Sequence, residues 1–158
     1  SAEAAMGVVR QTVYENQLTL HPGKTQMRDA RNQSFEFLGY HFRGGLRLTR
    51  KKRLAKLKGA VRVETKRTSG QSLPFVCARL SRRLRGWFTY FRHCQESEFR
   101  SLDGWIRGRL RSILRKRAGG TGRGRGADHQ RWPNAYFHKL GLYSLKAAHE
   151  RFRQSSLR

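Results

Sequence analysis

The sequence predicts a mainly α protein with a small β-hairpin, in which a three-helix bundle follows a small α+β part and precedes a short helical C-terminal segment. Two observations support this fold class. Apolar residues recur at helical spacing over three long segments between residues 50 and 117. Before them lies a short aromatic segment with alternating side chains, followed by a glycine pair, which is typical of a hairpin.

The N-terminal part is expected to hold one helix and the hairpin. Residues 1–17 have apolar side chains at roughly helical spacing, although no capping signal precedes them. His21-Pro22-Gly23 has the composition of a turn. Ser34 to Phe42, SFEFLGYHF, is predicted to form one strand, and Leu46 to Leu48 its partner across Gly44-Gly45.

Three longer helices are predicted next. Thr49 is expected to cap a helix from about Arg50 to Lys66. A second runs from about Pro74 to Arg92, because proline suits a first turn. A third covers about Ser97 to Arg117. The apolar seam of the second helix is Val76, Leu80, Leu84, Trp87 and Phe91, and that of the third is Phe99, Leu102, Ile106, Leu110 and Ile113.

After the third helix, Gly119 to Gly126 (GGTGRGRG) is expected to be a flexible basic linker. The stretches 132–145 and 144–153 are predicted to form one or two short helices.

The charge indicates the class of partner. The chain has 35 Lys and Arg against 10 Asp and Glu, a formal net charge of +25. Such an excess needs a polyanion to offset its self-repulsion. Because the basic residues alternate with aromatic residues on amphipathic helices, the composition favours a folded nucleic-acid binder over a disordered tail. An anionic lipid surface is a minor alternative.

Arginines lie beside the apolar seams of the predicted helices, and their spacing predicts contacts with the phosphates of a nucleic acid. Guanidinium groups one turn apart offer forked donors to successive phosphates. A solvated helix face is the alternative, but from Arg79 to Arg92 no acidic residue is interspersed. In the third helix, an outward-facing stripe is expected of Arg100, Arg107, Arg111 and Arg115. Gly104 and Gly108 lie at the edge of this stripe, where close approach of a phosphate backbone or of a neighbouring helix would explain them, as would a tolerated surface glycine.

The sequence gives only weak signals for base stacking, catalysis or metal binding. Trp87 falls on an apolar seam and is expected in the core, whereas Trp105 lies off its seam and is the candidate for stacking on a base or for docking between subdomains. The acidic residues are scattered, and the pair Glu96 and Glu98 stands where a helix starts. No histidine or cysteine spacing typical of a metal site occurs, and Cys77 and Cys94 suggest no disulfide framework.

Two sequence blocks strongly resemble the thumb, or maturase-specific X domain, of group II intron reverse transcriptases: Leu80 to Arg92 and Phe99 to Arg117. The family pattern there is an LRGW-x-x-YF block followed by F-x-x-LD-x-WIRRRLR. LTLHPGKT, Leu18 to Thr25, is similar to a motif near the end of the palm. FLGY, Phe37 to Tyr40, is similar to an element associated with the primer grip. Residues 132–137 and 140–145 resemble the C-terminal stretch of bacterial members.

The resemblance implies the C-terminal part of such a protein. It divides the chain into a palm remnant at 1–48, the thumb/X domain at 49–117, a Gly/Arg linker at 118–126 and a DNA-binding-like helical segment at 127–158. The family's catalytic Y-x-D-D motif would precede Ser1, so we expect no polymerase activity from this chain alone. Lys24 matches a lysine thought to assist nucleotidyl transfer, a role that requires a palm on another chain. Mg²⁺ would then be the cofactor there, and none is expected within this chain.

The predicted function is an RNA-binding maturase module that assists intron splicing or retrohoming and clamps an RNA template–primer. The alternatives are the C-terminal subunit of a split reverse transcriptase and a non-catalytic component of a ribonucleoprotein. Expected partners are group II intron or related RNA, target DNA and a catalytic chain, in a bacterial-type cytoplasm. Phe37, Leu38, Gly39 and Tyr40 form the primer-grip-like element. The residues predicted to bind RNA are Arg50, Lys51, Lys52, Arg53, Arg79, Arg82, Arg83, Arg85, Arg100, Arg107, Arg111 and Arg115.

Overall fold

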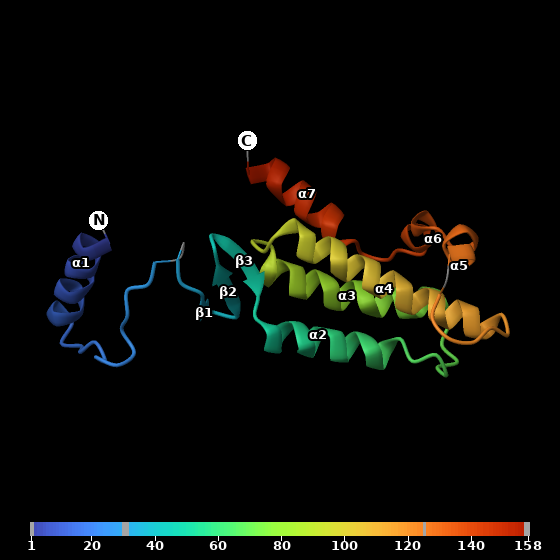
Figure 1. Ribbon diagram of the computed structural model, residues 1–158, viewed down its shortest axis with the longest axis horizontal. Coiled ribbons are helices and arrows are strands. Elements are labelled where there is room, and N and C mark those ends of the chain that lie inside the picture. Colours follow the sequence, from blue (N-terminus) through green and yellow to red (C-terminus); the bar gives the residue numbers. More distant parts are fainter. Residues whose placement is uncertain (1, 30–31, 125, 157–158) are drawn as a thin grey trace.

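The computed structural model describes residues 2–29, 32–124 and 126–156 and has a helical bundle with a small sheet at one end (Figure 1). The mainly α class with a small β element is confirmed. In chain order the elements are α1 (Ala2–Glu15), β1 (Phe35–Phe37), β2 (Tyr40–Arg43), β3 (Leu46–Thr49), α2 (Lys51–Glu64), α3 (Leu73–Phe91), α4 (Glu96–Arg117), α5 (Gly126–Arg131), α6 (Asn134–Lys139) and α7 (Leu145–Ser156).

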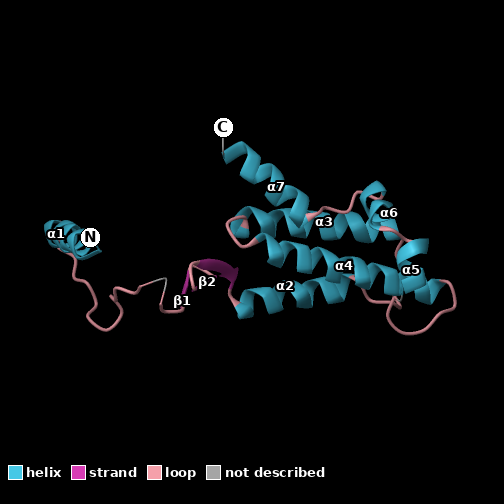
Figure 2. Ribbon diagram, turned by 45° about the horizontal axis from the view of Figure 1, so that its top comes forward, coloured by secondary structure: helices cyan, strands magenta, loops and turns pink. Residues whose placement is uncertain are grey.

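Helices α2, α3 and α4 lie side by side, and α3 and α4 bury most of their predicted apolar seams (Figures 1 and 2). The Ser72 hydroxyl caps α3 by accepting from the Phe75 backbone N–H at 3.4 Å, and Pro74 stands in the first turn. All five predicted seam residues of α4 are buried, as are four of the five in α3. Trp87 is the fifth and is only half-buried against this core.

The sheet corrects one prediction. Residues 34–42 form two strands joined by a turn at Leu38-Gly39, not one strand. Both turn residues have positive φ, 47° and 84°, which is the geometry of a tight hairpin turn. The order is β1-β2-β3, antiparallel throughout, with Phe37 opposite Tyr40.

The start of α2 corrects a second prediction. Thr49 ends β3 and is buried, and Arg50 is the N-cap residue, without a side-chain capping bond. The Thr49 backbone N–H donates to the Glu98 carboxylate of α4 at 2.9 Å, and its hydroxyl contacts the Cys94 sulfur at 3.5 Å. These contacts fix the sheet to the end of the bundle.

Helix α1 is where the sequence predicted a helix, but none of its residues is buried. It lies away from the bundle (Figure 1). The exposed apolar side chains here include Val8, Val9, Tyr14 and Leu18.

The glycine-rich segment is packed on α4, contrary to the expectation of a flexible linker. A Cβ atom on Gly120 would come within 2.8 Å of the Arg115 Cγ, and one on Gly124 within 3.0 Å of the Arg111 Cβ. Arg115 also donates to the Thr121 carbonyl at 2.7 Å. Beyond the segment, Trp132, Phe137, Leu142, Leu145 and Ala148 belong to the same core as the three long helices.

Asp103 of α4 caps the N-terminus of α7. Its buried carboxylate accepts from the backbone N–H groups of Leu145 and Lys146, at 3.0 and 3.1 Å, and from the Ser144 hydroxyl at 2.7 Å. Negative charge at a helix N-terminus satisfies free donors and interacts favourably with the helix dipole. This carboxylate therefore fixes α7 to the bundle.

We predict that Asp103→Ala destabilises the protein by about 2 kcal/mol, because three donors lose a charged acceptor in a buried site. Hydrogen exchange should accelerate first in α7, and thermal unfolding should show the full loss of stability. Glu150→Ala, which removes the exposed ion pair with Lys146, is the control. Equal effects of the two substitutions would contradict the role of Asp103.

His149 of α7 is buried against the Phe99 ring, with 4.9 Å between centroids, and its Nδ1 lacks a hydrogen-bond partner within the described chain. Burial lowers the pKa of His149 below its usual 6.5, and Arg153 and His93 act in the same direction. Glu96 and Glu150 oppose the shift. The folded protein thus favours the neutral form of His149.

The free energy of unfolding is expected to fall as the pH drops below about 6.5, because the unfolded chain then binds a proton that the folded chain resists. The His149 contribution is fully present above that pH. Thermal unfolding between about pH 7.5 and about pH 5 should show a smaller pH dependence in His149→Gln than in wild type. The exposed His138→Gln should retain the wild-type dependence, and a wild-type slope in His149→Gln would be evidence against this account.

Candidate nucleic-acid interface

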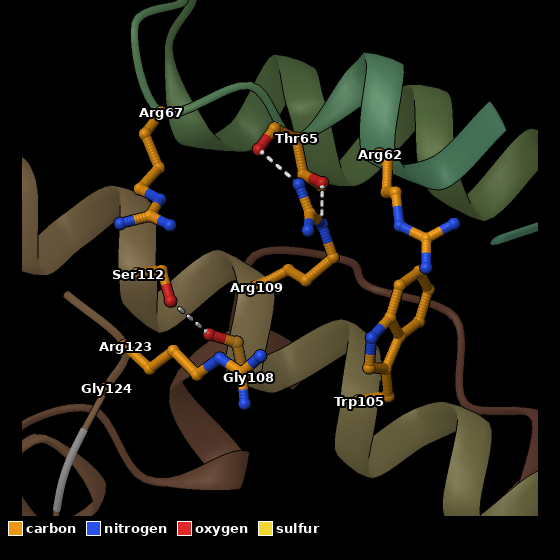
Figure 3. A pocket seen from close by; sticks show the side chains of 9 residues that line it. All are labelled: Arg62, Thr65, Arg67, Trp105, Gly108, Arg109, Ser112, Arg123 and Gly124. Carbon is orange, nitrogen blue, oxygen red and sulfur yellow. Dashed lines mark hydrogen bonds between the residues drawn. The ribbon is translucent and has the colours of Figure 1, made fainter. Parts of the chain in front are cut away.

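A basic recess lies between α2, α4 and the two loops that follow them (Figure 3). Its volume is about 390 Å³. Arg62 comes from α2, Arg67 from the α2–α3 loop, Arg109 from α4 and Arg123 from the glycine-rich segment. The other described lining residues are Thr65, Trp105, Gly108, Ser112 and Gly124, so no carboxylate lines the recess within the described part of the chain. Four guanidinium groups around one opening suit an anion.

Arg109 is the anchored member of this group. Its Nε donates to the Thr65 hydroxyl at 2.5 Å and its Nη2 to the Thr65 carbonyl at 3.2 Å. Burial lowers the pKa of Arg109, and the neighbouring charges of Arg62 and Arg67 add to that shift. The site therefore holds more positive charge than its surroundings balance.

Trp105 organises the cations beside the recess. Lys58 Nζ, Arg62 Cζ and Arg109 Cζ lie over the indole at 5.7, 5.6 and 5.7 Å from its centroid. The negative face of an aromatic ring attracts cations at such distances. The predicted stacking candidate is thus half-buried and already in contact with positive side chains.

Most of the arginines and lysines predicted to bind RNA are exposed. Nine of the twelve fall in the exposed class: Arg50, Lys51, Lys52, Arg53, Arg79, Arg82, Arg83, Arg85 and Arg100. Arg50 pairs with Glu36, and Arg100 with Glu96 at 3.0 Å. Arg79 and Arg83 share the buried carboxylate of Glu64, at 3.3 and 2.8 Å, which ties α3 to α2. Their side chains remain 44% exposed, so they keep donors toward solvent.

One arginine of the stripe on α4 does not have the predicted orientation. Arg111 was expected to face outward, but it is buried, and it donates to the Trp132 carbonyl and to Asn134 Oδ1, both at 2.9 Å. Arg115 and Arg107 are half-buried, and pair with Asp128 at 2.9 Å and with Asp103 at 3.9 Å. Arg111 and Arg115 therefore bind the C-terminal segment to α4, whereas Arg107 pairs with a carboxylate of its own helix.

The primer-grip-like element forms the tip of the hairpin. Phe37 and Leu38 are exposed, and Leu38 has a φ of 47°, a strained value for leucine. The Tyr90 hydroxyl donates to the Leu38 carbonyl at 2.6 Å, and the Tyr40 hydroxyl donates to the Tyr90 carbonyl. Gly39 packs against the Phe91 ring. The apolar tip is thus held rigidly on the end of α3.

Lys24 and the two cysteines are the remaining residues that the sequence singled out. Lys24 is exposed in the segment between α1 and the sheet. The thiols of Cys77 and Cys94 are buried, which raises their pKa values to about 11 and about 12. Among the described residues, no three His, Cys, Asp or Glu side chains are placed to hold a metal ion. No helix in the described chain is long and apolar enough to cross a membrane.

Sequence reasoning singled out Trp105 and Gly108 of the recess but none of its arginines. Arg109 follows Trp105 by four positions, so both lie on one face of α4, and that spacing could have suggested the pair. Arg62, Arg67 and Arg123 come from other elements, and no local pattern brings them together. Gly104 and Gly108 have no neighbour within 4 Å of an added Cβ, which excludes the close helix contact weighed above.

A family comparison agrees with the resemblance in the sequence. The model of the "Group II intron, maturase-specific domain" family matches residues 54–132, which is 79 of the 158 residues. The chain therefore belongs to this family, and a maturase-type function linked to group II introns is supported. The matched span covers most of the bundle, the glycine-rich segment and every residue of the basic recess. A search of curated proteins found no match.

We predict that Arg111→Gln lowers the free energy of unfolding by about 3 kcal/mol, because the Trp132 carbonyl and Asn134 Oδ1 lose a buried charged donor. Arg100→Gln, at an exposed position on the same helix, should cost under about 1 kcal/mol. Chemical denaturation measures both. If Arg111→Gln were as stable as Arg100→Gln, the structural role of this guanidinium would be refuted.

Proposed function

We propose that this chain is an RNA-binding maturase module that grips structured group II intron RNA and assists its splicing or retrohoming. The main observation behind this proposal is the basic recess inside the maturase-specific domain. Four arginines from separate elements line it, and none of its described lining residues is a carboxylate. Ten acidic residues in the whole chain cannot neutralise 35 basic ones. The remaining positive charge needs a polyanionic partner.

RNA is a better fit than a sequence-specific duplex DNA site. The cations are mostly arginines on helix faces, and their forked donors suit phosphate oxygens. A-form RNA hides its base edges in a deep, narrow groove, so shape and phosphate contacts dominate its recognition. Arg53, Arg82 and Arg85 are exposed and supply such contacts outside the recess.

The hairpin tip favours one second candidate, in which the chain clamps a template–primer duplex beside a polymerase half on another polypeptide. Phe37 and Leu38 project from a strained turn that Tyr90 holds in place. Strain of this kind persists where the surrounding structure imposes it and often accompanies function. Primer extension with a catalytic chain and Mg²⁺, compared between wild type and Leu38→Gly, tests this candidate: loss of extension with unchanged intron binding supports it, and unchanged extension refutes it.

We expect the affinity for structured intron RNA to fall on the order of 10³-fold between about 50 and about 200 mM salt, because bound phosphates release counterions. Arg53→Gln with Arg82→Gln should reduce the slope of log affinity against log salt by about 1 to 2. Arg10→Gln with Arg28→Gln removes the same charge from the N-terminal region and is the control. Fluorescence anisotropy over a salt series measures both. A salt-insensitive affinity, or equal changes from both pairs, would count against the proposal.

A further inference from the structure

We propose that the basic recess binds one phosphate group of a sharply turned RNA backbone, and that this contact distinguishes folded RNA from a regular duplex. The inference rests on the proposed RNA-binding function and assigns one ligand group to one cavity. Its parts are the anchored Arg109, the cations around Trp105, the loop arginines Arg67 and Arg123, and the open wall at Gly108.

Arg109 presents ready donors to such a phosphate. A guanidinium has five N–H groups, and Thr65 accepts from the Nε and Nη2 atoms. The bonds to Thr65 fix the plane of the guanidinium, so less side-chain entropy is lost when a ligand binds. The donors left over line a recess bounded by α2, α4 and the glycine-rich segment (Figure 3).

The electrostatics of the recess favour an anion over a neutral ligand. Like charges on Arg62 and Arg67, together with burial, disfavour the charged form of Arg109. Arginine nonetheless stays protonated, so the repulsion persists in the free protein. A phosphate placed among these groups replaces repulsion with charge-assisted hydrogen bonds. The indole of Trp105 offsets the repulsion only in part, by cation–π contacts.

Arg123 is positioned by the packing of its segment on α4. Gly124 lies against the Arg111 side chain, where a Cβ would approach to 3.0 Å. Arg67 donates to the Gly122 carbonyl at 3.1 Å and so links the two loops. The two loop arginines therefore border the recess together.

The shape of the site selects a projecting phosphate. The recess has a volume of about 390 Å³, which is in the range of small-ligand pockets. Because it is a concavity between two helices, a phosphate must project from its backbone to enter it. Phosphates of a regular duplex follow a smooth convex surface, whereas a tight turn or a bulge projects one outward. Gly108 keeps one wall open, since an added Cβ there meets no atom within 4 Å.

Gly108→Leu and its matched control Gly104→Leu test the inference. Both glycines lie in α4 with free space around them, but only Gly108 lines the recess. Both substitutions raise helix propensity and should raise the melting temperature. We expect Gly108→Leu to weaken binding to a structured RNA that contains a tight turn by at least about tenfold, equivalent to about 1.4 kcal/mol. Gly104→Leu should bind that RNA as wild type does.

Two further measurements separate the possible ligands. Titration with inorganic phosphate, followed by NMR at the Trp105 indole N–H and the Arg109 Nε–H, should give saturable shifts in wild type. Those shifts should vanish in Gly108→Leu and in Arg67→Gln with Arg123→Gln. A regular RNA duplex should bind wild type and Gly108→Leu equally.

Three outcomes would overturn the inference. If Gly108→Leu and Gly104→Leu bind the turned RNA equally, the recess is not its phosphate site, although RNA binding itself stands. If inorganic phosphate shifts the resonances but Gly108→Leu leaves RNA affinity unchanged, the site takes a free anion and not the RNA backbone. Equal weakening on turned and duplex RNA would show that the contact is not selective for shape. Failure of wild type to bind any structured RNA would instead refute the proposed function.

Discussion

The buried carboxylate of Asp103 and the buried guanidinium of Arg111 join the C-terminal helices to the bundle, and the position of every later element depends on them. Asp103 accepts three hydrogen bonds at the start of α7, and Arg111 donates to Trp132 and Asn134 at the junction of α5 and α6. Each of these charged groups is paired with hydrogen-bonding groups of the chain, which limits the cost of removing it from water. Helix α4 therefore connects two parts of the chain that the sequence separates by a run of glycines.

Arginine has two physical roles in this protein, and the face of α4 decides which. On the face toward α5 to α7, Arg111 and Arg115 are covered and their donors are used within the chain. On the face toward α2, Arg109 borders an open recess and keeps donors available. An amphipathic helix with arginines on both polar flanks thus supplies structural bonds on one side and ligand contacts on the other. Net charge alone does not distinguish the two uses.

The parts of the fold with a strong local signal could be predicted from the sequence. The seams of α3 and α4 follow the helical period over 19 and 22 residues, and nearly all of their members are buried. The turn at Leu38 could not be predicted, because no sequence pattern indicates a positive φ at a leucine. The hydrogen bond from the Tyr90 hydroxyl to the Leu38 carbonyl holds this turn in place. Arg111 was misassigned because a buried arginine and an exposed one share the same spacing, and only the cover from α6 separates them. The recess was missed because its arginines come from four different segments of the chain.

The glycine-rich segment couples the stability of the fold to the geometry of the recess. Its glycines at 120 and 124 lie directly on the aliphatic parts of Arg115 and Arg111, where an added Cβ would approach to 2.8 and 3.0 Å and require the neighbouring side chain to shift. The guanidinium groups of the same two arginines bind the segment and the helices after it. Arg123, between these contacts, reaches the recess only while the segment stays packed on α4. The position of Arg123 at the recess thus depends on hydrogen bonds made elsewhere in the fold. Loss of those bonds would displace this arginine without changing the net charge of the chain.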